Sequence, residues 1–154
     1  MPELFTIPPA SAKPLWVVAA IGALLLSLLL FFAYVVYASR ATQYEISRDG
    51  LAVRRTPYGR TIPWPSLDVA QARVVDLRNV SELRPTLRTN GIGLPGYQAG
   101  WFRLGERGRG LLFVTDPSRV VALPTRDGFT LLLSVQEPAA FLEAIRRAAT
   151  QRSG

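Results

Sequence analysis

One long stretch without a charged residue limits the architectures open to this chain. Residues 15–38 are 24 uncharged, mostly apolar residues. An α-helix rises about 1.5 Å per residue, and roughly 20 residues cross the hydrocarbon core of a bilayer. Trp16 near one end, and Tyr34 and Tyr37 near the other, lie where interfacial aromatic residues are common. The stretch therefore predicts a transmembrane helix over residues 15–38.

Two other interpretations of this stretch stay open. A buried helix of a soluble protein is usually shorter and seldom apolar on every face. A cleaved signal peptide would suit the small residues Ala38, Ser39 and Ala41. Its apolar core, however, runs about 7–15 residues behind a basic segment. Here the core is longer, and only Glu3 and Lys13 are charged before it, so a retained anchor is favoured.

The predicted helix divides the chain into four parts. Residues 1–14 contain four prolines among small residues and are predicted to be a disordered tail. Residues 39–43 form a linker, and residues 44–150 form a single domain. Five extended residues reach roughly 17 Å, so the linker would hold the domain close to the lipid headgroups.

Charge predicts the orientation of that domain. The chain has 17 Arg and one Lys against 11 acidic residues, a net charge of +7. Glu3 and Lys13 cancel, so the whole excess follows the apolar stretch. The positive-inside rule places such a segment in the cytoplasm. The sequence therefore predicts a single-pass protein of the inner or plasma membrane with a cytoplasmic C-terminal domain.

After residue 42 the pattern changes to short, alternating runs separated by turn residues. Asp49-Gly50 is a strong two-residue hairpin signal between two such runs. Pro63 and Pro65 interrupt the next short run and favour an edge strand there, and a fourth strand is expected over residues 69–77. In all, the pattern predicts a mainly β domain of about seven antiparallel strands.

The C-terminal segment is predicted to be the only helix of this domain. Ser134 and Glu137 have the spacing of a capping box, and Pro138 suits a first helical turn. Phe141, Leu142, Ile145 and Ala148 then form one apolar stripe. Such an amphipathic helix would cover the open end of a small barrel.

These features together resemble a family of bacterial pleckstrin-homology-like (PH-like) domain proteins. The resemblance covers residues 40–148, and its most distinctive part is the glycine-rich segment 88–102. Residues 111–116 and 131–134 and the closing helix also fit. The resemblance implies a PH-like split barrel of seven strands capped by a C-terminal α-helix, in a membrane-associated protein. It supplies no catalytic residues.

The composition argues against catalysis. The chain has no histidine and no cysteine, so it lacks the commonest general base, the commonest metal ligand and any thiol nucleophile. Its acidic residues are isolated, without recognisable spacing for acid–base work. We therefore expect no enzyme activity, no catalytic residues, no cofactor and no metal site.

The glycine-rich segment is the best candidate for a partner surface. Gly91, Gly93 and Gly96 match G-x-G-x-x-G, but no strand-then-helix context surrounds them, so no nucleotide site is expected. A long loop over residues 79–99, with glycines that permit positive φ and close backbone packing, is the prediction. The candidate contact residues are Asn90, Gly91, Gly93, Gly96, Tyr97 and Trp101. For the two aromatic residues, a place in the core is the alternative.

The scattered arginines suggest a second kind of contact. They do not cluster along one helix face, so nucleic acid is not an expected partner. Anionic lipid headgroups are nearer, and the candidate headgroup contacts are Arg40, Arg48, Arg54 and Arg55. The Asp49-Gly50 turn is too short to build a headgroup cup, and an ordinary solvated basic surface is the alternative.

Two functions remain after these exclusions. The first is a membrane-anchored PH-like module that docks a protein partner or the anionic membrane surface. The second is a small structural accessory subunit of a membrane protein complex, with Gly22 and Ser27 on a helix-packing face. The sequence does not identify the partner.

Overall fold

A computed structural model describes residues 3, 5, 8, 9, 11, 13–105 and 108–153 of the chain. The predicted tail, residues 1–14, lies largely outside the described residues. The chain divides into two compact units, residues 1–38 and residues 39–154. The first unit contains most of a long helix, and the second contains all of the strands.

The long helix, α1, spans Lys13–Ala41, a length of 29 residues. It is long and apolar enough to cross a membrane, and at about 1.5 Å per residue it measures roughly 44 Å. The helix continues into the predicted linker, residues 39–43. Only Thr42 therefore separates α1 from the first strand.

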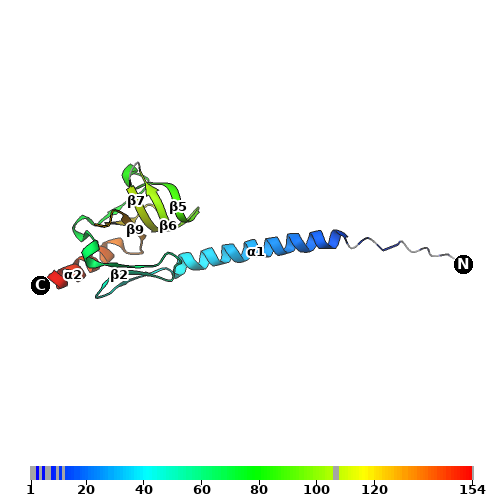
Figure 1. Ribbon diagram of the computed structural model, residues 1–154, viewed down its shortest axis with the longest axis horizontal. Coiled ribbons are helices and arrows are strands. Elements are labelled where there is room, and N and C mark those ends of the chain that lie inside the picture. Colours follow the sequence, from blue (N-terminus) through cyan, green and yellow to red (C-terminus); the bar gives the residue numbers. More distant parts are fainter. Residues whose placement is uncertain are drawn as a thin grey trace. The chain divides into compact units, whose positions relative to one another are not determined.

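The second unit is built from two antiparallel-rich sheets and one helix. A three-stranded sheet has the order β1-β2-β3, and a six-stranded sheet has the order β4-β8-β9-β7-β6-β5 (Figure 1). The elements are β1 Gln43–Ile46, β2 Gly50–Arg54, β3 Thr61–Pro63, β4 Arg73–Val75, β5 Pro85–Leu94, β6 Tyr97–Leu104, β7 Gly108–Val114, β8 Val120–Pro124, β9 Thr130–Ser134 and α2 Pro138–Ser153. This architecture confirms the predicted mainly β fold with a C-terminal helix, although the described residues form nine strands rather than about seven.

The middle of the six-stranded sheet departs from the predicted all-antiparallel arrangement. β9 lies between β7 and β8, and it runs parallel to β7 with Leu111 opposite Leu131 and Phe113 opposite Leu133. β8 and β9 are antiparallel neighbours. Such pairing depends on contacts between distant segments, which a local alternation pattern does not encode.

Both faces of the central strands β7, β8 and β9 are buried by apolar side chains. One face carries a cluster that includes Phe102, Leu112 and Leu132, and the 75–83 segment packs onto it through Val75, Leu77, Val80 and Leu83. The alternate residues of the same strands point to the opposite face. There α2 contacts β1, β4 and β8, with Ile145 fully buried.

The turn between β1 and β2 lies one residue earlier than predicted. The Ser47 amide donates to the Gly50 carbonyl at 2.9 Å, so Arg48 and Asp49 form the two-residue turn. Gly50 is the first residue of β2 and lies opposite Pro63 of β3. A Cβ at this position would lie 2.0 Å from the Ile62 carbonyl oxygen. Glycine is needed here for the close approach of β3.

The predicted capping box at Ser134 is wrong. Ser134 is the last residue of β9, and its hydroxyl accepts hydrogen bonds from the amides of Thr115 and Asp116 at 3.1 and 3.2 Å. α2 begins at Pro138, as the fit of proline to a first turn predicts, and the Glu137 carbonyl accepts from the Phe141 amide at 3.0 Å. Residues 135–137 are not helical, and the hydrogen bonds of the Ser134 hydroxyl go to residues 115 and 116.

The predicted strand over residues 69–77 is mostly irregular. Only Arg73–Val75 is β-strand, and a 3₁₀ turn occupies Val69–Gln71 before it. β3 lies at an edge of its sheet, as Pro63 predicts.

Candidate functional site beside the β5–β6 hairpin

The glycine-rich segment is a β-hairpin and not the predicted long loop. β5 and β6 pair along most of their length, and Pro95 and Gly96 form the two-residue turn between them. Gly96 has φ 78°, and proline followed by glycine at the two central positions is the composition of a type II turn. A run of glycines thus forms paired strands.

Two of these glycines let the backbones of β5 and β6 approach closely. Gly91 and Gly100 lie opposite each other, and a Cβ on Gly100 would lie 2.6 Å from the Cα atom of Gly91. Gly100 also has φ 112°, which favours glycine. Close packing therefore explains Gly91 and the turn explains Gly96, and β6 rather than a helix follows the G-x-G-x-x-G pattern.

Two bulges bend the first half of β5. The register with β6 shifts at Thr86 and again at Thr89. The Thr86 hydroxyl donates to the Arg103 carbonyl at 3.2 Å, and the Thr89 hydroxyl donates to the Trp101 carbonyl at 3.0 Å. Each extra residue is thereby tied back to β6. Bulges increase local twist, and residues 85–88 line one groove together with residues 93–96 at the tip of the hairpin.

The bent hairpin and the β7–β8 turn enclose a groove of about 620 Å³. Its apolar lining includes Leu87, which is 55% exposed, and the ring of Phe102 from the core. Arg88 is the one charged residue among those that line it. The complete lining is Pro85, Thr86, Leu87, Arg88, Gly93, Leu94, Pro95, Gly96, Tyr97, Gln98, Phe102, Val114, Thr115 and Pro117.

Hydrogen bonds fix the wall of the groove that the β7–β8 turn provides. Asp116 accepts from the amide and the hydroxyl of Ser118 at 2.8 and 2.6 Å, and the Ser134 hydroxyl donates to the Asp116 carbonyl at 3.1 Å. The Leu77 amide donates to the Pro117 carbonyl at 2.9 Å. The turn is therefore held from β9 and from the segment after β4.

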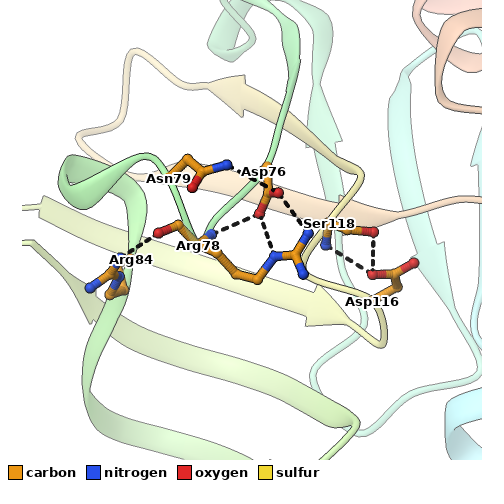
Figure 2. Close-up of polar contacts among 6 residues, drawn as sticks. All are labelled: Asp76, Arg78, Asn79, Arg84, Asp116 and Ser118. Carbon is orange, nitrogen blue, oxygen red and sulfur yellow. Dashed lines mark hydrogen bonds and ion pairs between the residues drawn. The ribbon is translucent and has the colours of Figure 1, made fainter.

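A second group of polar contacts, within residues 76–84, holds that segment together (Figure 2). Arg78 donates to both carboxylate oxygens of Asp76, from Nε at 3.0 Å and from Nη2 at 2.8 Å. Asn79 donates to Asp76 at 3.3 Å, and Arg84 donates to the Arg78 carbonyl. These contacts fix the conformation of the segment that leads from β4 to β5.

The two carboxylates in Figure 2 are held in their charged forms. Hydrogen bonds from Arg78 lower the pKa of Asp76 below its ordinary 3.8. Hydrogen bonds from Ser118 lower the pKa of Asp116 in the same direction, and Arg119 and Arg78 add to the effect. Both groups therefore stay ionised at neutral pH.

The structure divides the six predicted partner-surface residues among three places. Gly93, Gly96 and Tyr97 line the groove. Gly91 packs against the backbone of β6. Asn90 and Trp101 are a cross-strand pair, and alternation places them on the opposite face of the hairpin from Arg88 and Phe102.

The two predicted aromatic anchors have different environments. Tyr97 is 5% exposed, which fits the core alternative. It lies near Tyr44, whose phenol has a pKa raised by burial and by Tyr97. Trp101 is half-buried, with its ring 5.1 Å from Phe129 and the guanidinium groups of Arg60 and Arg109 at 5.7 and 5.1 Å from its centroid. Trp101 is thus covered by its own chain.

The predicted headgroup arginines do not converge on one site. Arg40 lies in the last turn of α1, and Arg48 lies in the β1–β2 turn. Arg54 and Arg55 lie at the far end of β2, about 20 Å from Arg48 at roughly 3.3 Å per residue. Arg54 also pairs with Glu45 at 2.7 Å. All four are exposed, which fits the alternative of an ordinary solvated basic surface.

Several groove residues were not predicted from the sequence. Leu87, Arg88 and Phe102 lie inside or beside the glycine-rich segment, and an exposed leucine next to arginine was the available signal. Val114, Thr115 and Pro117 are remote in sequence and reach the groove through the β6–β7 pairing. The spacing of these residues in the sequence does not indicate that they lie close together.

The family model for the bacterial PH domain matches residues 42–149. The chain belongs to the bacterial PH domain family. No curated protein and no solved structure matches it. The match runs from the residue before β1 into the last turns of α2, so both sheets, the groove and the closing helix belong to the PH domain.

Proposed function

We propose that this protein is a membrane-anchored binding module whose PH domain docks a protein partner in the groove beside the β5–β6 hairpin. The observation that carries the proposal is the groove itself. It combines exposed apolar side chains, a single guanidinium and a wall fixed by hydrogen bonds. Such preformed concave surfaces with an apolar anchor position are typical of binding sites.

A protein partner suits this site better than a lipid headgroup. Arg88 is the single charged residue lining the groove, whereas a phosphorylated headgroup needs several converging cations. The four candidate headgroup arginines are spread over separate elements. A domain with this excess of basic residues would still be attracted non-specifically to an anionic membrane surface.

We assign no catalytic role to the groove. Its lining contains no carboxylate, and the chain has no histidine or cysteine. Within the described residues no three metal-ligating side chains come together. The accessory-subunit alternative stays a prediction for α1, where the Ser27 hydroxyl donates to the Ala23 carbonyl of the same helix.

Site-specific photocrosslinking in cells tests the docking proposal. Leu87 on β5 and Val74 on β4 are exposed apolar residues on the two edge strands of one sheet, at 55% and 41% exposure. Benzoylphenylalanine at Leu87 should crosslink a discrete protein, while the same group at Val74 should not. Equal crosslinking at both positions, or none at Leu87, would contradict docking in the groove.

The proposal also places α1 across the membrane with the PH domain in the cytoplasm. Because the chain has no cysteine, Asp127→Cys in the β8–β9 turn gives a single thiol. A membrane-impermeant maleimide should label it only after the cells are permeabilised. Labelling in intact cells would contradict the proposed orientation. Recovery of the protein in the soluble fraction, without membranes, would contradict the anchor.

A further inference from the structure

The two edges of the six-stranded sheet are protected to different degrees. β4 has three residues, and Arg146 of α2 donates to the Ala72 carbonyl beside it at 3.2 Å. β5 has ten residues, and among the described residues it pairs with β6 alone (Figure 1). Unpaired edge strands are templates for pairing with another chain, and proteins usually shorten, bulge or cover them.

Only the first half of β5 carries such protection. The bulges at Thr86 and Thr89 interrupt the ladder there. From Asn90 to Leu94 the register with β6 is unbroken over five residues, without a proline or a charge. This half of the edge has the regular geometry that strand addition requires.

The position of the turn identifies the backbone groups that face outward. Leu94 and Tyr97 close a two-residue turn and form a hydrogen-bonded pair, and the pairs alternate from there. Gly93 and Gly91 therefore belong to non-hydrogen-bonded pairs, whose N–H and C=O groups point away from β6. The close approach of Gly91 to Gly100 has the same explanation, since non-hydrogen-bonded pairs lie closer together.

The free edge and the groove meet at Gly93. A Cβ there would lie 3.6 Å from the Phe102 ring and 3.8 Å from Cδ of Arg88. A chain paired with Gly93 would direct alternate side chains toward Phe102 and the Arg88 guanidinium. In the described part of the chain no carboxylate lies within ion-pair distance of Arg88.

We propose that an extended, acidic segment of the partner protein adds to β5 as a seventh strand. Its backbone pairs with Gly91 and Gly93, one apolar side chain enters the groove, and a carboxylate binds Arg88. This inference rests on the proposed docking function and specifies its partner. The excess of basic residues in the chain favours an acidic segment.

The test uses a phage-displayed library of random 12-residue peptides on the full chain in phosphatidylcholine nanodiscs. Selected peptides should alternate apolar residues with Asp or Glu. Gly93→Pro removes the outward N–H and also fixes φ at that residue, and Arg88→Gln removes the cation. Each should weaken binding about tenfold or more, as lost hydrogen bonds to backbone or charge do. Gly93→Ala keeps the N–H and is the matched control, with at most a few-fold loss.

N-methylation of each peptide residue in turn provides a measurement that does not depend on the folding of a variant. Strand addition predicts losses at every second residue. Binding that survives both Gly93→Pro and N-methylation, yet is lost with Leu87→Asp, would overturn strand addition and leave docking in the groove intact. A library that yields no binder would also overturn strand addition. The crosslinking experiment at Leu87 tests the docking function separately.

Discussion

The Ser134 hydroxyl, at the end of β9, holds the β7–β8 turn in place. It accepts from two amides and donates to one carbonyl, and it thereby joins the end of β9 to residues 115 and 116. A single hydroxyl thus satisfies three backbone groups beside the groove. The turn itself is exposed, so water replaces part of this bonding when the hydroxyl is removed.

Ser134→Ala should therefore lower the unfolding free energy by about 1 kcal/mol, and Ser134→Thr should retain most of it. Urea denaturation of the full chain in detergent measures the change. Glu137→Ala distinguishes this role from a capping box, because a capping box would make it costly as well. A loss with Glu137→Ala comparable to that with Ser134→Ala would contradict the turn assignment.

At the scale of elements, the network of Asp76 and Arg78 holds the segment after β4 in its folded path through contacts within residues 76–84. The pKa of Asp76 is lower in the folded protein than its ordinary 3.8. Such a group stabilises the fold above the unfolded-state pKa, and the contribution is lost as the pH falls through the folded-state value. The network therefore weakens only in acid.

Asp76→Asn should flatten the decline of the unfolding free energy below about pH 4. Denaturant titrations between pH 3 and pH 7 provide the comparison. Asp127→Asn is the matched control, since the Asp127 side chain makes no ion pair or hydrogen bond in the described structure. Identical slopes for the wild type and Asp76→Asn would show that the network does not respond to acid.

The sequence predicts those elements whose pattern is local. Strands at 44–46, 51–53 and 111–114 follow from alternation or short apolar runs, and α2 follows from one apolar stripe. The β5–β6 hairpin was missed because glycines usually mark loops, whereas here they permit close strand pairing. Three predicted contact residues reach the groove, but its walls depend on the two threonine bulges and a distant turn.

At the scale of the whole molecule, residues 39–154 form a compact unit with its own core and an excess of basic residues. The arginines are distributed rather than convergent, which favours a diffuse attraction to anionic surfaces. Diffuse attraction is screened by salt and does not distinguish lipids of equal charge.

The isolated unit should therefore bind vesicles of anionic lipid weakly and dissociate near roughly 0.5 M salt, where the Debye length is about 4 Å. Sedimentation with vesicles at increasing salt measures this. Arg54→Glu with Arg55→Glu should reduce binding only partly, because other arginines contribute. Saturable, salt-resistant binding to one lipid would reveal a headgroup pocket outside the groove.

The position of β9 bears on how the protein is made. β7 and β8 are consecutive in the sequence, but β9 lies between them in the sheet. During synthesis, residues 130–134 emerge after all the other strands, so the sheet keeps a vacant central position until nearly the whole chain has left the ribosome. Until then β7 and β8, although paired with β6 and β4, lack the neighbour that joins them. A ribosome that stalls before residue 130 would therefore leave a chain without a completed core, and such a chain would be a substrate for proteases.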